Sequence, residues 1–235
     1  MGAILSRILM GCIVLANYKL ISLEKIPSTQ DYAMDLIASG TASDHMAILA
    51  AAQSNGRGRY RRKWVSHHGN LYISFIYKCP ERDARLSYRV AIAVAETIAS
   101  FGIHPTIKWP NDIMVDGKKI AGILIEYSGD FVVVGVGINV NSNPTVPAYQ
   151  TTKMENYSEI PMMELLRRLL NNMERWHRAD FRTVRSRWTD LASALNRPVK
   201  YQGAIAELIG INENGALILR RDSRYLLVYG DEVTI

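Results

Sequence analysis

Hydrophobic and polar residues in the first third of the chain follow the periods of short strands and one helix. Residues 17–24 have the pattern of a strand. A helix is expected to begin next, with Ser28 or Thr29 as its N-cap, Asp31 in its first turn and Gly40 at its end. Apolar runs of strand length follow at residues 45–53 and 70–79.

The middle of the chain combines one helical region with a β-rich region. Residues 83–101 are rich in alanine and predict a long, mostly buried helix, which Gly102 and Pro105 end. Residues 107–140 predict three β-rich runs. Two turns join these runs and are the strongest hairpin signals in the chain, at Asp116-Gly117 and Ser128-Gly129-Asp130.

The last third changes from helical to β-type periodicity. Apolar residues recur at helical spacing at positions 162, 163, 166, 169, 170, 173 and 176. A second helix is expected at residues 180–194. From Pro198 onward, short strands broken by glycines predict a small β-barrel of about 40 residues. We therefore expect two domains, residues 1–195 and residues 196–235.

Composition fits a globular chain with an affinity for anions. Of the 235 residues, 48% are hydrophobic and 21% are charged, as is typical of soluble domains. The net charge of +6 favours association with phosphates or an acidic partner. Cys12 and Cys79 form no metal-ligand spacing and no disulfide framework, so a cytoplasmic setting is expected. The apolar N-terminus contains Arg7 and lacks the ~20 apolar residues of a membrane span, so we expect a buried strand or helix there and no membrane.

The segment "SNGRGRYRRKW", residues 54–64, concentrates positive charge on a glycine-containing loop. Five of the seven residues from Arg57 to Lys63 are basic. Glycines let backbone amides approach an anion, arginines bind phosphate or carboxylate through two hydrogen bonds, and Trp64 can stack on a base. Basic residues interleaved with aromatic residues are also typical of nucleic-acid binding. The loop alone therefore predicts either an anion clamp or an RNA-binding patch.

Two further stretches carry candidate chemistry near expected strands. In "KWPNDI", residues 108–113, a proline-fixed turn sets Asn111 and Asp112 side by side, although a simple turn has the same composition. In "GKKIAGILIE", Lys118 and Lys119 point to opposite faces of a strand, so one of them can face a pocket. A lysine in a pocket is a cation for a reacting carboxylate or phosphoryl oxygen. Two exposed hairpin lysines are the alternative.

The run "VVVGVGINVN" contains glycines at alternate positions of an apolar strand. Alternation puts Gly135 and Gly137 on the same face, which leaves a slot where a flat ligand could lie against the backbone. No third glycine opens a helix after them, so this is not a dinucleotide-binding fingerprint. A β-bulge is the other explanation of the pair.

Taken in this order and spacing, the motifs strongly resemble those of the biotin protein ligases, also called biotin acetyl-CoA-carboxylase ligases. The matching stretches are "PSTQ", "Q-x-x-G-R-G-R-x-x-R-K-W", "K-W-P-N-D", "K-K-I-A-G-I-L-I-E" and "G-V-G-I-N-V-N", over about residues 20–143. The resemblance implies an α+β fold with a mixed or antiparallel sheet flanked by helices, similar to class II aminoacyl-tRNA synthetases. It also implies that the C-terminal strands form a small SH3-like barrel.

This resemblance implies a two-step reaction. The biotin carboxylate attacks the α-phosphate of ATP, with Mg²⁺, and gives biotinyl-5′-adenylate and pyrophosphate. A lysine amine of a biotin carboxyl carrier protein then attacks the mixed anhydride and releases AMP. An ordered basic loop would exclude water from that hydrolysable anhydride.

The family's site residues carry over onto matching positions of this chain. Biotin is expected to contact Ser28, Thr29, Gln53, Gly56, Arg57, Lys119, Gly122, Gly135 and Gly137. ATP and the adenylate are expected to contact Arg59, Arg62, Trp64, Asn111, Asp112 and Asn139. Catalytic roles are implied for Lys119, which would bridge carboxylate and α-phosphate, for Arg59, which would hold phosphate, and for Asp112, which would orient groups or accept the amine's proton. Trp64 would cover the adenine, and the metal ligands stay open.

Other expectations follow from the comparison with the family. Gln30 stands where the family usually has asparagine. About 27 residues precede Ser28, too few for the winged helix of DNA-binding members, so no DNA partner is expected. Members often dimerise through the main sheet, which leaves a homodimer open. The competing functions are a lipoate or octanoate ligase of the same fold and an RNA-binding module.

Overall fold

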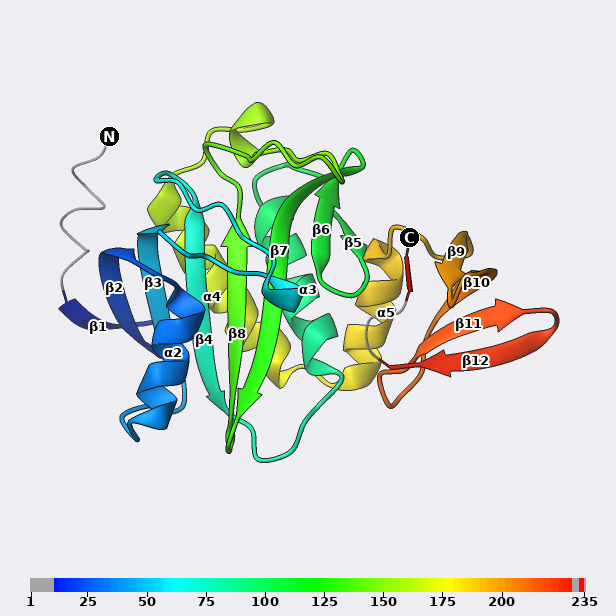
Figure 1. The fold of residues 1–235 in the computed structure, drawn as a ribbon, viewed down its shortest axis with the longest axis horizontal. Helices are drawn as coiled ribbons and strands as arrows, with labels where there is room; N and C mark the ends of the chain where they lie inside the picture. The colour runs from blue at the N-terminus through cyan, green and yellow to red at the C-terminus, as the bar shows by residue number, and fades with distance from the viewer. Residues whose placement is uncertain (1–10, 230–232, 235) are drawn as a thin grey trace.

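The computed structural model describes residues 11–229 and 233–234, which contain two β-sheets (Figure 1). The larger sheet has the strand order β1-β2-β3-β4-β8-β7-β6-β5. β2 and β3 pair in parallel and the other neighbours are antiparallel, so the expected mixed sheet is confirmed. The strand bounds are β1 Gly11–Leu15, β2 Tyr18–Ile26, β3 Met46–Gln53, β4 Leu71–Lys78, β5 Thr106–Lys108, β6 Asp112–Val115, β7 Lys118–Ser128 and β8 Phe131–Ile138.

Helices cover both faces of this sheet, as expected for the α+β class. Their bounds are α2 Thr29–Ala38, α3 Leu86–Ala99, α4 Met162–Arg178 and α5 Phe181–Leu191, with short 3₁₀ turns η1 Arg59–Arg61 and η2 Met154–Asn156. The Ser28 hydroxyl caps α2 by accepting from the Asp31 N–H at 3.3 Å, which matches the N-cap expected from sequence. We call the face covered by α2 the front and the face covered by α3 and α4 the back (Figure 1).

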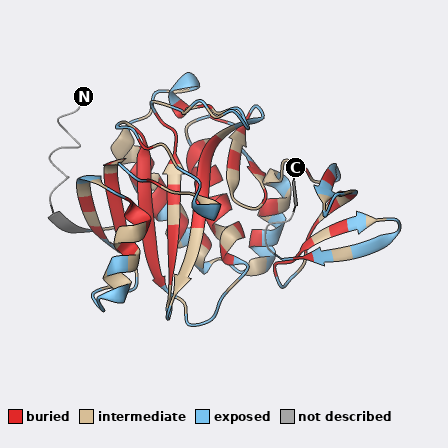
Figure 2. Ribbon diagram, viewed as in Figure 1, coloured by how far each residue is buried: buried red, intermediate tan, exposed pale blue. Residues whose placement is uncertain are grey.

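Strand alternation separates the residues of the two faces. Ile76 and Val133 pack with Ala33 of α2 on the front. Phe75 and Val134, each one position further along, join the large cluster on the back. Both faces of β4 are therefore buried from Leu71 to Tyr77, and Figure 2 shows β3 and β4 almost entirely buried.

The β-rich region from residue 106 contains four strands, one more than the sequence predicts. The additional strand, β5, is three residues long and is separated from β6 by the turn that contains Pro110. The two predicted turns, at residues 116–117 and 128–130, connect β6 to β7 and β7 to β8 as expected. The predicted helices exist, but α3 begins at Leu86 and α5 ends at Leu191, inside the predicted bounds.

The smaller sheet follows α5 and has the order β12-β11-β10-β9-β13. Its strands, all antiparallel, are β9 Pro198–Tyr201, β10 Ala204–Ile211, β11 Leu217–Arg221, β12 Arg224–Val228 and β13 Val233–Thr234. The Tyr88 hydroxyl of α3 donates to the Gly215 carbonyl at 3.0 Å and so links this helix to the turn between β10 and β11.

Two expectations concern the N-terminus. Most of the apolar N-terminal stretch, residues 1–10, lies outside the described residues, and β1 directly after it pairs with β2. Within the described part of the chain, no helix has the length and apolar character needed to cross a membrane.

Candidate active site

A pocket of about 280 Å³ lies on the front face of β4, β7 and β8, beside α2. We call residues 54–64 the basic loop; the segment containing it crosses in front of β8 and β7 in Figure 1. The loop forms one wall of the pocket, the turn and strand around Asn111 form another, and Ala148 and Tyr149 close a third side. The volume is at the lower end of the range for small-molecule sites.

The floor of the pocket is made of glycine backbone. Gly122 of β7 pairs directly with Gly137 of β8, and both face the pocket. A Cβ atom at either position would come within 2.8 Å of the Trp64 indole ring, and one at Gly135 would lie 2.6 Å from Gln30 Oε1. Gly135 and Gly137 share this face as predicted, and the space beside them is filled in this structure by Gln30 Oε1 and the Trp64 ring.

One end of the pocket is a connected set of neutral polar groups, which we call the polar end. The Ser74 hydroxyl lies 2.9 Å from Thr29 Oγ1 and 3.1 Å from Gln30 Oε1. The Thr29 backbone N–H donates to Gln53 Oε1 at 2.8 Å, and Gln53 Nε2 donates to Ser66 Oγ at 2.8 Å. Such a network fixes the side-chain orientations and leaves hydroxyl and amide groups ready for a polar ligand ring.

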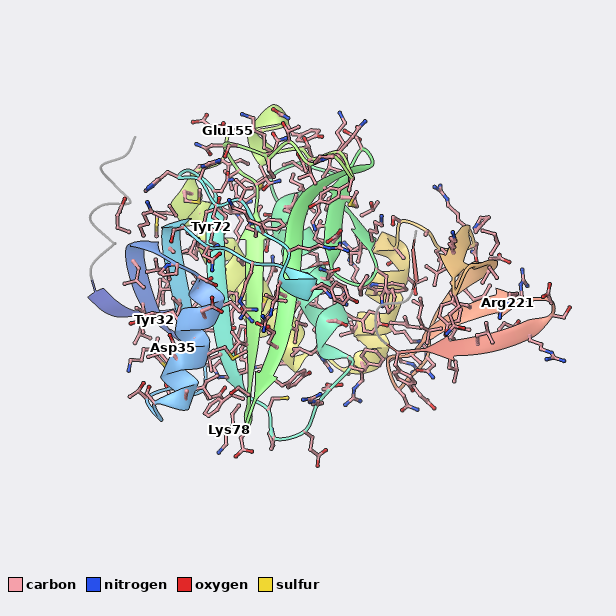
Figure 3. The ribbon with its side chains drawn as sticks, viewed as in Figure 1. Tyr32, Asp35, Tyr72, Lys78, Glu155 and Arg221 are labelled. Atoms are coloured by element: carbon pink, nitrogen blue, oxygen red, sulfur yellow. The ribbon has the colours of Figure 1, made fainter. Side chains whose placement is uncertain are left out.

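Tyr72, labelled in Figure 3 near the start of β4, borders the polar end. Its hydroxyl donates to the His67 carbonyl at 2.9 Å and so ties the strand to the segment that follows the basic loop. Burial raises the pKa of Tyr72 to about 12, so the phenol stays neutral at physiological pH.

The opposite end, which we call the charged end, is built around Lys119. Its Nζ lies 2.6 Å from Asp112 Oδ1 and 5.3 Å from the ring centroids of both Trp64 and Tyr149. Only 12% of the Lys119 side chain is exposed, whereas Lys118 belongs to the exposed residues. Of the two lysines, Lys119 is therefore the one that faces the pocket. The ammonium group, placed between two aromatic rings and beside a carboxylate, is a cation available to an anionic ligand.

Asn111 and Arg59 complete the charged end. Arg59 Nη1 donates to Asn111 Oδ1 at 3.3 Å, and Asn111 Nδ2 donates to the Ile123 carbonyl at 3.0 Å. The guanidinium groups of Arg59 and Arg62 lie 5.3 Å and 5.6 Å from the Tyr60 ring centroid. This geometry collects two guanidinium groups at the tip of the basic loop, next to the amide and carboxylate of β6 and its preceding turn.

Arg57 has a different environment from the other arginines of the loop. Its Nε lies 2.6 Å from Asp31 Oδ1 and its Nη1 lies 2.7 Å from Glu126 Oε1. These hydrogen bonds, the Glu126 bond first, raise the pKa of Arg57 above its already high ordinary value. Neither carboxylate could be predicted as a partner of Arg57, because nothing in the sequence relates Asp31 or Glu126 to a residue 26 or 69 positions away.

The structure brings together all of the candidate site residues except Gly56 and Asn139. Those that line the pocket are Ser28, Thr29, Gln53, Arg57, Arg59, Arg62, Trp64, Asn111, Asp112, Lys119, Gly122, Gly135 and Gly137. Gly56 is a buried residue of the loop itself, where a Cβ atom would be 2.5 Å from Ser66 Oγ. Asn139 is buried behind the pocket wall and its Nδ2 donates to the Thr152 carbonyl at 3.0 Å. Ser74, Gln30 and Tyr149 line the pocket without having been predicted to do so.

The fold and the pocket together define a class of protein. A solved structure of the biotin protein ligase from Aquifex aeolicus in complex with biotin and ATP superimposes with a TM-score of 0.81 and 26% sequence identity. The match covers 92% of this chain and 97% of that chain. The mixed sheet and its helices therefore have the fold of a biotin protein ligase.

Sequence comparison places the chain in a family. Residues 22–143, which include all the motifs of the pocket, match the Biotin/lipoate A/B protein ligase family, and the chain belongs to it. It is 31% identical over 237 residues to the bifunctional ligase/repressor BirA of Escherichia coli, with 89% of this chain and 72% of BirA covered. It is also 31% identical over 200 residues to the biotin–[acetyl-CoA-carboxylase] ligase of Paracoccus denitrificans, with coverages of 74% and 83%. The resemblance stated from the motifs is confirmed.

Proposed function

We infer that this protein is an ATP-dependent ligase that activates biotin as biotinyl-5′-AMP and transfers it to a lysine of a biotin carboxyl carrier protein. This inference rests on family membership and on one observation, namely the chemistry of the two ends of the pocket. A polar end suited to a neutral ring and a charged end suited to phosphates meet on a flat glycine floor. This division matches a substrate with a polar ring system at one end and a carboxylate at the other.

At the polar end, the hydroxyls of Ser28 and Thr29 and the amide of Gln53 are proposed to bind the ureido ring of biotin. Gly135 and Gly137 are proposed to let the bicycle approach the sheet once Gln30 and the Trp64 ring, which fill the space beside them, move aside. Arg59, Arg62, Trp64 and Asn111 are proposed to bind ATP and the adenylate, with the Trp64 ring covering the adenine after it leaves the glycine floor.

Lys119 is proposed to hold the biotin carboxylate against the α-phosphate of ATP. A carboxylate oxygen attacks the α-phosphorus, and the bond from that phosphorus to the pyrophosphate oxygen breaks. The ammonium group offsets the repulsion between the two anions and stabilises the charge that develops in the transition state. In the second step the lysine amine attacks the acyl carbon, the bond to AMP breaks, and Asp112 is the candidate acceptor of the amine proton.

We propose that ATP binds together with Mg²⁺. Among the described residues, no group of three or more His, Cys, Asp or Glu side chains could hold a metal ion without help. Mg²⁺ commonly binds through one or two carboxylates together with substrate phosphates, and Asp112 supplies a carboxylate in the pocket wall. When bound, the ion would neutralise charge on the phosphates.

Several finer points accompany this proposal. The smaller sheet is proposed to be the SH3-like barrel, with the domain division between residues 195 and 196, which lies in the connection between α5 and β9. A homodimer through the main sheet and a cytoplasmic location remain proposals, the first from the family resemblance and the second from the cysteine usage.

A lipoate or octanoate ligase is the alternative within the family. An octanoyl transferase needs a cysteine nucleophile, and Cys79 is not among the residues of the pocket; its Sγ lies 2.9 Å from the Glu81 carbonyl. An RNA-binding module is disfavoured because the basic loop lies over a pocket and its first arginine is held by two carboxylates of the chain itself.

The deciding experiment is calorimetric titration with biotin, then with ATP and Mg²⁺, while pyrophosphate release is followed. Saturable biotin binding with biotin-dependent pyrophosphate release is expected. Activation of lipoate or octanoate in place of biotin would contradict the proposal that biotin is the substrate, while the proposal of an acid-activating ligase would stand. Silence toward all three acids, together with salt-sensitive RNA binding, would contradict the ligase function.

A further inference from the structure

The basic loop consists of a fixed stem and an exposed tip. In the stem, residues 54–58 and 64, the Trp64 backbone N–H donates to the Gly56 carbonyl at 2.8 Å, and the Gly58 N–H of the stem donates to the carbonyl of Arg62 in the tip at 2.7 Å. Arg57 and Trp64 are half-buried, whereas residues 60–63 at the tip are exposed. The stem is therefore the more buried part of this loop.

Arg57 joins this stem to two elements on opposite sides of the pocket. Asp31 lies in the first turn of α2, and Glu126 lies on the front face of β7, in register with Val133 of β8. Val133 itself is packed under α2, so the ion pairs lie where the helix-covered part of the front face meets the open pocket. Arg57 thus spans the mouth of the polar end from helix to strand.

The charge balance around Arg57 argues against a direct role in binding anions. Two carboxylates at 2.6 Å and 2.7 Å occupy its guanidinium through Nε and Nη1. The Arg57 side chain is 22% exposed, and its partners Asp31 and Glu126 are 42% and 31% exposed, so solvent screens the pairs only in part. A phosphate approaching Arg57 would meet a net negative cluster.

We propose that Asp31 and Glu126 are positioning residues that fix the stem of the basic loop, through Arg57, over the polar end of the pocket. In this arrangement Arg57 orders the loop, and the arginines at the tip remain for the phosphates. The consequence rests on the proposed function: a fixed stem keeps biotin and its adenylate in place, while movement for the entry of ATP and the carrier lysine is confined to the tip.

The test compares the variants D31N, E126Q and D31N/E126Q with the wild-type protein. In the double variant the KM for biotin is expected to rise about tenfold, because the loop no longer closes the polar end, while kcat for pyrophosphate release stays within about twofold. Free biotinyl-adenylate is expected to leave the enzyme faster. Trypsin is expected to cut at Arg or Lys of the loop faster, because the stem opens. The shorter carboxylate in E126D should restore part of the biotin affinity.

Asp35 supplies a matched control. It lies one turn after Asp31 on the exposed side of α2 (Figure 3), so D35N should change neither biotin KM nor loop cleavage. A decrease in the KM for biotin or ATP in the double variant would mean that the carboxylates hold back an anion-binding Arg57, and would overturn the proposal. Unchanged KM and unchanged cleavage would overturn it as well.

Failure of this proposal is distinguishable from failure of the proposed function. If the wild-type protein releases no pyrophosphate with biotin, the ligase function fails, but trypsin cleavage of the loop still measures whether the two carboxylates fix it. If the double variant does not fold, E126Q alone provides the same comparison, since it keeps the contact of Arg57 with Asp31.

Discussion

The two faces of the central strands β4 and β8 differ in the size of the side chains that they carry. On the back of β4 and β8, Phe75 pairs with Val134, both fully buried in the main core. One position earlier on β4, on the front, Ser74 pairs with Gly135. The back face is filled with large side chains, and the front face at the same level has small ones that leave a pocket. The difference shows that the site exists where small front-face residues of β4, β7 and β8 leave space beside α2.

The division between the faces predicts that back-face substitutions reduce stability and front-face substitutions reduce activity. Phe75→Ala should have the largest effect, a loss of about 3–5 kcal/mol in the free energy of unfolding, because a fully buried ring leaves a cavity. Urea unfolding measures it. Ile205→Ala removes a side chain that is 64% exposed and serves as the control. A raised biotin KM in the folded fraction of Phe75→Ala would contradict the separation of the faces.

Lys119→Ala tests the front face. Adenylation is expected to fall about 100- to 1000-fold, because no other group replaces the cation between carboxylate and phosphate. Biotin binding by calorimetry should weaken but remain measurable through the polar end, and the chain should stay folded with a lower unfolding midpoint, because Asp112 loses its partner at 2.6 Å. The exposed neighbour gives the control variant Lys118→Ala. Undiminished pyrophosphate release would remove Lys119 from the mechanism.

Local features of these faces could be predicted from sequence because they depend on neighbouring residues. The Asp116-Gly117 turn, the Ser28 cap and the shared face of Gly135 and Gly137 follow from backbone preference and strand period alone. The helix ends were less well predicted, since α3 begins at Leu86 after a stretch with the same composition. Family motifs, more than periodicity, made it possible to choose Lys119 over Lys118.

Contacts between distant segments could not be predicted in this way. Arg57 was expected to contact biotin, and its pairing with Asp31 and Glu126 depends on where α2 and β7 come together. Asn139 matches a site residue in the family motif, but its amide Nδ2 donates a hydrogen bond to the Thr152 carbonyl. The position of the Trp64 ring on the glycine floor likewise depends on the path of the basic loop.

Gly137→Ala, on the front face, is expected to reduce the free energy of unfolding by less than Phe75→Ala on the back face. The new Cβ would lie 2.7 Å from the Trp64 ring, so the indole must shift at a cost of about 1–3 kcal/mol. Unfolding measurements should show this loss in the wild-type background and not in Trp64→Ala, because the clash is then absent. An equal loss in both backgrounds would mean that strand backbone, and not the ring, resists the methyl group.

The smallest expected effect is a change in the pH dependence of the unfolding free energy. It is caused by His177, which lies behind the sheet. The His177 ring on α4 stacks on Tyr77 at 4.7 Å between centroids. Burial, and then His45 and Arg89, lower the pKa of His177 below 6.5, while Glu174 and Asp44 act in the opposite direction. The folded protein therefore binds this proton less readily than the unfolded chain. The stability that the neutral ring confers is present above about pH 6.5 and is lost as the pH falls through the lower pKa of the folded state.

His177→Gln removes this titration without touching the pocket. The difference in unfolding free energy between pH 7.5 and pH 5.5 should shrink by less than about 1 kcal/mol, because the ring is only half-buried and solvent screens its charge. Pyrophosphate release by the folded variant should keep the pH profile of the wild type, since His177 lies behind the sheet from Lys119. An altered activity profile would show that protonation on the back face is transmitted to the front, and the two faces would then not be independent.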